Sequence, residues 1–231
     1  MNARGFARLA TLAMGLGIGA AVASTPGIAA ADALDFQISI DGYELLPLEG
    51  NGATATSSFG DIAIAWGDGA NADATGGVGD FAEAVGNGAG ASAGGNSASN
   101  FDSAINIGDD TGTGGHAYAL YGSDNLSYVD APNSTAWAGG NVTDSSLTGS
   151  NDVSAIVDPF GQGGDIAFSG AGFSGSTGNF DLAAILFDDN ATAAAPTGAN
   201  FLYDILSPLG SEANTAAATS GGWLAELLAL F

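Results

Sequence analysis

The sequence contains no cysteine and almost no basic residues. Of its 231 residues only two are lysine or arginine and one is histidine, whereas 25 are acidic, so the formal net charge is −23. Without cysteine the chain forms no disulfide and offers no thiolate, so packing and hydrogen bonds must stabilise it. With so few cations it cannot neutralise phosphate groups, which argues against nucleic acid as a partner and favours cationic or basic partners.

Large apolar side chains are also scarce. Hydrophobic residues make up 46% of the chain, which argues against an unstructured polymer, but many of them are alanine and 38 further residues are glycine. We therefore expect a thin, repetitive core in place of a deep globular one.

The N-terminal segment has the features of a Sec-type signal peptide. Arg4 and Arg8 precede the apolar run LATLAMGLGIGAAVA, which is too short and too rich in glycine to span a membrane as a helix. The small residues of GIAAADA suit cleavage after Ala31, with Ala33 as the second choice. A retained membrane anchor is the lesser alternative. Cleavage removes both basic residues and no acidic one, which leaves a side-chain charge of −25.

The rest of the chain divides into three segments: a β-hairpin cap at 32–52, a repetitive β-solenoid at 53–195 and an amphipathic helical segment at 196–231. The hairpin is predicted from DFQISIDGYELLPL, where Asp41-Gly42 is a favoured two-residue turn. This register places Ile40 opposite Tyr43, Ile38 opposite Leu45 and Phe36 opposite Pro47. The resulting apolar face must be covered, so we expect the hairpin to cap or join the sheet that follows.

The central segment repeats itself. GDIAIAWGDGA at 60–70 and GDFAEAVGNGA at 79–89 share the leading Gly-Asp, two alternate alanines and the closing Gly-Ala, at an offset of 19 residues. Looser copies follow in FDSAINIGDD, HAYALYGSD, GGDIAFSG and GNFDLAAILFDDNA. Period-two alternation ended by Gly and Asp indicates a strand and a tight turn, and repeats of this length stack. We predict an all-β fold, an irregular β-solenoid or β-roll.

The alternation gives each strand a bulky face and an alanine face. The bulky face carries Ile62, Ile64, Trp66, Phe81, Val85, Ile105 and Ile107; the other carries Ala63, Ala65, Ala82, Ala84 and Ala104. We expect the bulky face to lie inside, although Glu83 falls on it, so that Ile64→Asp should cost far more stability than Ala63→Asp. The opposite assignment stays open: a narrow interior lined by alanine, with an outer apolar stripe used for oligomerisation.

The phrases ISIDGYELLPLEGNGATATSSFGDIAIAWGDGANADATGG, NFDSA, GNFDLAAILFDDNA and TGANFLYDILSPLG resemble a family of exported glycine- and alanine-rich proteins of mycobacteria. This resemblance implies a bacterial source and a cell-envelope or extracellular setting, but no activity. The A-x-A-x-G-x-G-A units are more loosely similar to the β-roll head repeats of trimeric autotransporter adhesins. Those repeats are shorter and more regular, so trimerisation does not carry over.

The pattern changes to a helical period after residue 196. In NFLYDILSPLG the apolar residues Phe201, Leu202, Ile205 and Leu206 share one helical face, and in WLAELLALF the residues Leu224, Leu227, Leu228 and Phe231 do so. We expect two short helices that cap the open end of the solenoid. Docking of the last helix on a membrane or a partner is the alternative, which Glu226 and the lack of cations disfavour.

The sequence offers little for catalysis. His116 is the single histidine and no serine lies in a G-x-S-x-G turn, so a hydrolase triad has no members. The adjacent pairs Asp109-Asp110 and Asp188-Asp189 suggest a glycosidase, but neighbouring residues of a strand point to opposite faces. We assign no catalytic residue, no cofactor and no metal site.

Calcium is the stronger chemical alternative. If the coils are in register, turn aspartates form rows of the oxygen ligands that hard cations prefer. These residues are Asp61, Asp68, Asp80, Asp102 and Asp109. Against calcium, the nonapeptide repeat of calcium-binding β-rolls is missing apart from the fragment GQGGDIAF, and turn geometry alone favours Asp, Asn and Gly.

These observations together predict an exported, non-enzymatic structural or interaction protein of the cell envelope or extracellular space. The alternatives are a calcium-loaded adhesive head and, less favoured, an acid-active carbohydrate hydrolase. No membrane span is expected after signal cleavage, and oligomerisation is left open. Because carboxylates on stacked turns repel one another, we also expect raised pKa values, and a melting temperature that rises from pH 7 towards pH 5 and on adding salt.

Overall fold

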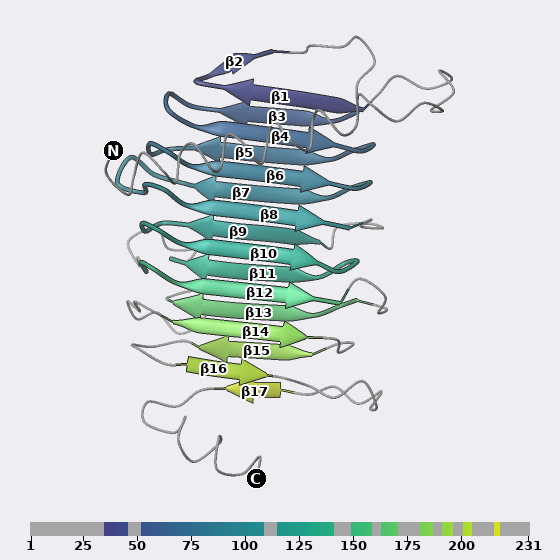
Figure 1. The fold of residues 1–231 in the computed structure, drawn as a ribbon, viewed down its shortest axis with the longest axis vertical. Coiled ribbons are helices and arrows are strands. Elements are labelled where there is room, and N and C mark those ends of the chain that lie inside the picture. The colour runs from purple at the N-terminus through teal and green to yellow at the C-terminus, as the bar shows by residue number, and fades with distance from the viewer. Residues whose placement is uncertain are drawn as a thin grey trace, which may run out of the picture.

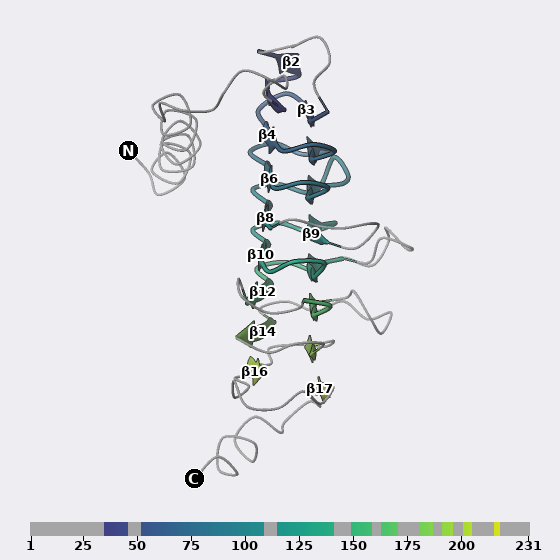
Figure 2. The same cartoon turned by 90° about the vertical axis from the view of Figure 1, so that its right-hand side faces the viewer.

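The chain winds into a parallel β-solenoid in which successive strands alternate between two facing sheets (Figures 1 and 2). The structure is a computed structural model that describes residues 35–45, 52–108, 115–140, 149–158, 163–170, 181–186 and 191–195, together with the backbone of 201–204 and 215–217. The prediction of an all-β solenoid is confirmed.

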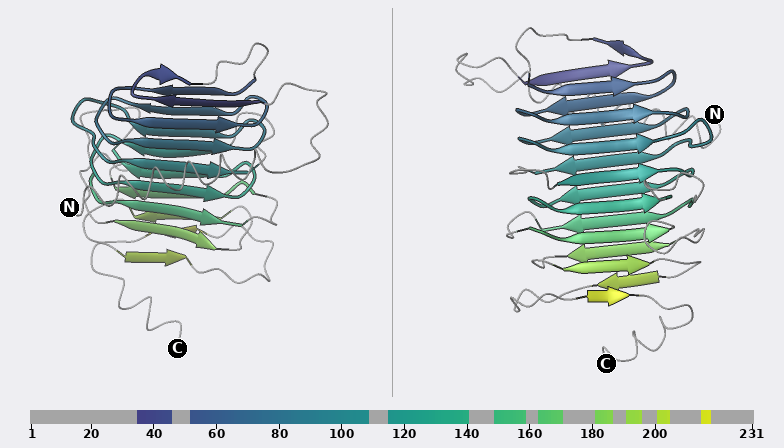
Figure 3. Two further views of the ribbon diagram at one scale, coloured as in Figure 1. Left: turned by 45° about the horizontal axis from the view of Figure 1, so that its top comes forward. Right: turned by 180° about the vertical axis from the view of Figure 1, so that it is seen from behind.

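Sheet A is nine-stranded, in the order β16-β14-β12-β10-β8-β6-β4-β1-β2, and sheet B is eight-stranded, in the order β17-β15-β13-β11-β9-β7-β5-β3. The strands of sheet A are β1 (Phe36–Ile40), β2 (Tyr43–Glu44), β4 (Ile62–Trp66), β6 (Phe81–Val85), β8 (Ser103–Ile107), β10 (Leu126–Asp130), β12 (Val153–Val157), β14 (Leu182–Leu186) and β16 (Phe201–Asp204). The strands of sheet B are β3 (Thr54–Ser57), β5 (Asn71–Thr75), β7 (Gly90–Gly94), β9 (His116–Leu120), β11 (Thr135–Gly139), β13 (Ile166–Gly170), β15 (Thr192–Ala195) and β17 (Thr215–Ala217). Each coil therefore adds one strand to each sheet, as the view from behind also shows (Figure 3).

The N-terminal hairpin closes the first edge of sheet A. Ile40 pairs with Tyr43 as predicted, and the Leu45 amide donates to the Ile38 carbonyl at 2.9 Å. The expected partner of Phe36, Pro47, lies outside the described residues. Strand β1 runs antiparallel to β4, so the hairpin joins the sheet, as expected. Its inward side chains are polar: Gln37 Oε1 accepts a hydrogen bond from the Ala55 amide of β3 at 2.6 Å.

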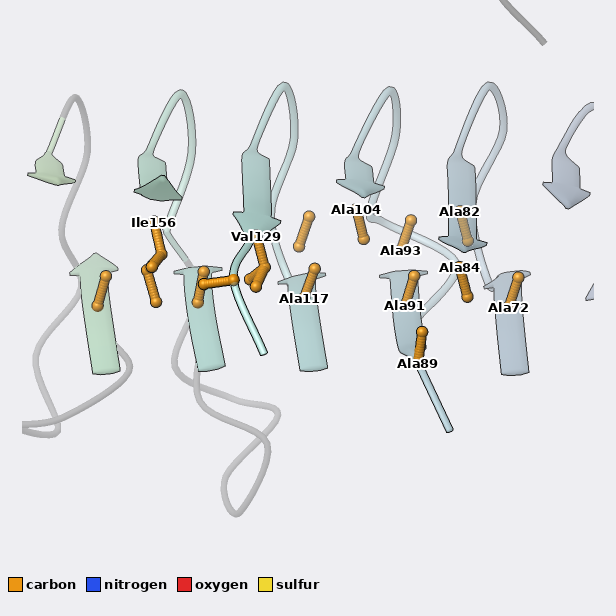
Figure 4. Packing of buried hydrophobic residues seen from close by; sticks show 14 of the residues in the cluster. Ala72, Ala82, Ala84, Ala89, Ala91, Ala93, Ala104, Ala117, Val129 and Ile156 are labelled. Carbon is orange, nitrogen blue, oxygen red and sulfur yellow. The ribbon is translucent and has the colours of Figure 1, made fainter. Parts of the chain in front are cut away.

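The interior is lined mainly by alanine from both sheets, with Val129, Ile156 and Ile185 in the later coils, which overturns the expectation that the bulky face lies inside. Ala63 and Ala82 of sheet A and Ala72 of sheet B have no exposed surface, and the close view shows such side chains pointing toward one another between the sheets (Figure 4). The short connections between strands explain why the alanine face lies inside, because only residues 67–70 link β4 to β5. So short a link holds the sheets close together, and side chains larger than alanine on both inner faces would force them apart.

Polar groups on the inner face bridge the two sheets in the later coils. Ser127 Oγ donates to the Ala136 carbonyl at 2.9 Å, and Ser154 Oγ donates to the Ala167 carbonyl at 2.8 Å. Because the hydroxyls are hydrogen-bonded, their burial costs little. The two bonds tie β10 to β11 and β12 to β13.

The first of the two helices predicted after residue 196 is wrong over residues 201–204, and a further strand lies between the two predicted helices. Phe201–Asp204 forms β16, which pairs in parallel with β14, and Thr215–Ala217 forms β17, which pairs with β15. The last strand of each sheet presents unpaired backbone N–H and C=O groups. Hydrogen bonds to these groups favour a strand more than the helical spacing of the apolar residues favours a helix. The remaining residues of the predicted helices, including WLAELLALF, lie outside the described residues. Within the described part of the chain, no helix has the length and apolar character needed to cross a membrane.

Candidate functional site

A row of acidic and amide side chains runs along one corner of the solenoid. The residue immediately before each sheet-A strand from β4 to β14 is aspartate or asparagine, and we call this row the Asp/Asn ladder. Its members are Asp61, Asp80, Asp102, Asn125, Asp152 and Asp181. All six are buried. The stacking predicted for Asp61, Asp80 and Asp102 is thereby confirmed.

Each ladder side chain holds the backbone of the next coil. The Asp80 amide donates to Asp61 Oδ1 at 2.9 Å, the Asp102 amide to Asp80 Oδ1 at 3.0 Å, and the Asn125 amide to Asp102 Oδ1 at 3.0 Å. The same bond recurs up to Asp181. The backbone amide of each of these ladder residues, just before its strand, thus has an acceptor inside the protein, which a buried corner without water requires. The ladder is a structural device that sets the register of the coils.

Burial makes three of these carboxyl groups hard to ionise. It raises the pKa of Asp80 to about 6, that of Asp152 to about 7 and that of Asp102 to about 9. Neighbouring carboxyls add to the rise in pKa, and the backbone amides that bond to Oδ1 oppose it. Burial is the largest cause, whereas the sequence had suggested repulsion between charges. The second oxygen of each of the three, Oδ2, makes no hydrogen bond.

Glycine closes the corner over the ladder. At the end of β7, Gly94 has φ +95°, and a Cβ there would lie 2.3 Å from the Thr75 carbonyl oxygen and 2.5 Å from Asp80 Oδ2. Any side chain would therefore be strained and would collide with the neighbouring coil. The backbone can pass directly over the Asp80 carboxyl and exclude water from it because residue 94 is glycine.

The calcium hypothesis gains no support from this arrangement. The ladder oxygens Oδ1 face backbone amides, and within the described residues no group of three acidic or histidine side chains could hold a metal ion. Asp68 lies in another turn, where its amide donates to Asn87 Oδ1 at 3.2 Å. Asp109 lies outside the described residues, as do Asp110 and the pair Asp188-Asp189. Calcium binding therefore stays an untested prediction.

The outer face of sheet A is apolar over seven consecutive strands, from β1 to β14, and we call it the apolar face. It consists of Phe36, Ile38, Ile40, Ile62, Ile64, Trp66, Phe81, Val85, Ile105, Ile107, Leu126, Tyr128, Val153, Ala155, Val157, Leu182, Ala184 and Leu186. Most are half-buried against their neighbours in the sheet, while Ile107 and Leu126 are 36% and 38% exposed. Three polar residues interrupt the face: Glu83, Ser103 and Asp130.

Glu83 occupies the middle of the apolar face. It lies in register between Ile64 and Ile105, is only 4% exposed, and its Oε1 makes no hydrogen bond. Burial raises the pKa of this carboxyl. The pKa of Tyr128, two strands away, is raised by burial first, then by Asp130 and by the charge of Glu83. The expectation that the bulky face lies inside would have placed the Glu83 carboxyl in the interior. In the observed orientation of β6 this side chain lies on the outer face.

The outer face of sheet B is different in character. Its first strands carry Thr54, Thr56 and Asn71, and its later strands carry a row of rings. Tyr118 and Trp137 have ring centroids 4.7 Å apart, and those of Trp137 and Phe168 are 6.1 Å apart. Rings at this spacing on neighbouring strands pack against one another and stabilise the sheet. This row was not predicted from the sequence, although the ring at the third position of β9, β11 and β13 is a signal that could have revealed it.

His116 begins β9 on this outer face of sheet B. Its ring centroid is 5.3 Å from that of Tyr118, and it lies over Gly90, where a Cβ would come within 1.8 Å of Nδ1. Residue 90 must therefore be glycine for the imidazole to pack as it does. His116 thus extends the aromatic row, in keeping with the structural or surface role expected from the sequence.

Comparison of the chain with protein-family models, with curated proteins and with solved structures finds no match. The resemblance to exported mycobacterial proteins is therefore untested by these comparisons.

Proposed function

We propose that the protein is an exported, non-enzymatic interaction protein of the cell envelope or extracellular space, and that its partner binds the apolar face of sheet A. The observation that carries the proposal is the predominance of apolar side chains on this face over seven consecutive strands. Soluble monomers rarely expose a continuous apolar patch of more than a few hundred Å², and larger patches mark interaction sites.

The position of the large side chains supports a binding role. The solenoid gains its internal packing mainly from alanine, with Val129, Ile156 and Ile185 in the later coils. The outward Ile62, Trp66 and Ile107 are therefore not needed to fill its interior. Their cross-strand contacts stabilise the sheet, but alternating polar residues would form the same hydrogen-bonded strands and leave a soluble face. The N-terminal signal sequence supports the export of this surface.

The placement of the perturbed carboxyl groups favours a non-catalytic role. Asp80, Asp102 and Asp152 are buried in the Asp/Asn ladder, where each accepts a hydrogen bond from a backbone amide. A general acid and base must converge on a substrate that can reach them. The shifted pKa values are explained by structural burial, so they do not support the glycosidase alternative.

The acidic surface is smaller than the composition suggests. Among the residues that the structure describes, eight acidic side chains are buried: Asp61, Asp80, Glu83, Asp102, Asp152, Asp158, Asp165 and Asp181. Of the exposed ones, Asp41, Asp68 and Asp124 lie in turns beyond the ends of the strands, and Glu44 lies on the short edge strand β2. A basic partner would therefore meet the turns, and a partner that binds sheet A must be largely apolar.

The proposal is tested by capture from an extract of the source cell envelope on immobilised mature protein. We expect a component to bind wild type and the control Asn71→Asp, on the outer face of sheet B, but not the double variant Ile107→Asp/Leu126→Asp. Binding through apolar contacts should also survive about 1 M salt, which screens charges beyond about 3 Å. Equal capture by all three proteins, or release by salt alone, would contradict a role for the apolar face.

A further inference from the structure

We propose that the occupant of the apolar face is the same face of a second copy of this chain. This inference rests on the proposed function, because it takes the apolar face to be the binding surface. It adds the identity of the partner, and a symmetric arrangement of the two copies.

The distribution of charge favours a second copy over a basic partner. The mature chain carries 25 acidic residues and no lysine or arginine, so two copies repel each other over most of their surface. The only carboxyl side chains on the apolar face of sheet A, among its described strands, are those of Glu83 and Asp130. Two copies therefore meet little charge repulsion through this face, and a basic partner finds few counter-charges on it. In a two-fold dimer the same surface of both copies forms the interface, so an apolar face meets an apolar face.

The size of the face suits a dimer. Strands in a sheet lie about 4.8 Å apart and rise about 3.3 Å per residue, so seven strands of five residues cover roughly 30 by 16 Å. Two such footprints bury on the order of 1,000 Å², the lower limit for a specific protein interface. Packing of the two sheets face to face would resemble a β-sandwich, which is a common arrangement for sheets with apolar faces.

Glu83 gives the dimer a specific axis. The order of the seven strands is β1-β4-β6-β8-β10-β12-β14, so β8 is the central strand. A two-fold axis that runs parallel to β8, midway between the two packed faces, brings β6 of one copy opposite β10 of the other. Glu83 and Tyr128 are the middle residues of these two strands. Glu83 Oε1, buried and without a hydrogen bond in the single copy, then faces the phenol of Tyr128 of the second copy. A protonated Glu83 can donate to that phenol oxygen, which satisfies a polar group that the single copy leaves unpaired.

The mass of the mature protein in solution tests the second copy. Sedimentation equilibrium should give twice the monomer mass for wild type and for the sheet-B control Asn71→Asp, and the monomer mass for Ile105→Asp. Circular dichroism establishes that the variants are folded, and Ile107→Asp at the more exposed end of β8 replaces Ile105→Asp if that variant does not fold. A monomeric wild type at about 100 µM, where even weak dimers form, would overturn the proposal. If such a monomer still captured an envelope component through the apolar face, the proposed function would stand and the self-association alone would fail.

Cross-linking tests the position of the axis. The chain has no cysteine, so Ile105→Cys introduces a single thiol at the middle of β8. Sheets packed face to face lie about 10 Å apart, which is too far for a disulfide but within reach of a short bis-maleimide. We expect covalent dimers from Ile105→Cys and none from the control Ala155→Cys, which lies on β12, two strands from the axis. A dimer that cross-links through Ala155→Cys and not through Ile105→Cys would overturn the proposed arrangement.

Discussion

Replacing Ala72 with aspartate is expected to abolish the native fold at pH 7, whereas aspartate at the adjacent Asn71 should leave it intact. Ala72 has no exposed surface and lies in register with Ala55 and Ala91, which offer no polar side chain. A carboxylate at residue 72 would be both too large for the space between the sheets and without a counter-ion. An uncompensated buried charge costs about 3–5 kcal/mol, a large part of the stability of a typical domain.

Asn71 provides the matched control, because it lies on the same strand, is exposed and points away from the interior. The comparison is made by circular dichroism and urea unfolding of the two variants and wild type. Equal stability of Ala72→Asp and Asn71→Asp would show that residue 72 does not face a closed interior.

The melting temperature is expected to rise by more than about 10 °C as the pH is lowered from 8 to 5. The carboxyls of Asp80, Asp152 and Asp102 have pKa values of about 6, 7 and 9 in the folded protein, against 3.8 for an ordinary aspartate. The folded state therefore binds protons more readily than the unfolded chain does. The contribution of these three carboxyls to the free energy of unfolding is fully present below about pH 4 and is lost as the pH rises through the three pKa values. The contribution is about 1.4 kcal/mol for each unit by which a group's pKa is raised.

Asp102→Asn isolates the contribution of one ladder position. The amide keeps an oxygen to accept the Asn125 hydrogen bond, and Asn125 itself shows that the ladder accommodates asparagine. We expect the variant to melt higher than wild type at pH 7.5, no higher near pH 4, and with a weaker pH dependence. The exposed Asp68→Asn makes the same chemical change outside the buried ladder and should change the melting temperature little.

Sodium chloride should change the melting temperature much less than pH does, because ions screen buried groups poorly. This differs from the sequence-based expectation, in which screening of repulsion and lowering of the pH act alike. A melting temperature that falls steadily from pH 8 to pH 5 would show that the ladder carboxylates are ionised and held by the amides, and would contradict their neutral state.

The repeat was readable from the sequence because its period and its alternation have direct structural causes. Matching GDIAIAWGDGA with GDFAEAVGNGA aligns the residues that are register partners in β4 and β6, such as Ala63 with Ala82. The hairpin was equally clear, because Asp41-Gly42 adopts the positive φ angles, 53° and 81°, that its turn requires.

The direction of the two faces could not be read from one strand alone. Alternation shows that Ile64 and Ala63 point to opposite sides, but which side is internal depends on the facing sheet and on the length of the links between sheets. Ala55, Ala72 and Ala91 of sheet B supply that information, because a strand with alanine inside requires a close neighbour. The strand at Phe201–Asp204 was missed for a similar reason, since its partner β14 lies in a preceding coil.

The orientation of strand β8 is the most direct test of the whole account, because the interior, the ladder and the apolar face all follow from it. Ala104→Cys and Ile107→Cys place the only thiol of the chain on opposite faces of this strand. Labelling by a maleimide is followed in dilute native protein, where copies are separate, and again in urea. The account predicts that Ile107→Cys reacts in native protein nearly as fast as in urea, and that Ala104→Cys reacts on the order of 100-fold more slowly until the protein unfolds. Faster native labelling of Ala104→Cys than of Ile107→Cys would show that the bulky face is internal, and would contradict the account.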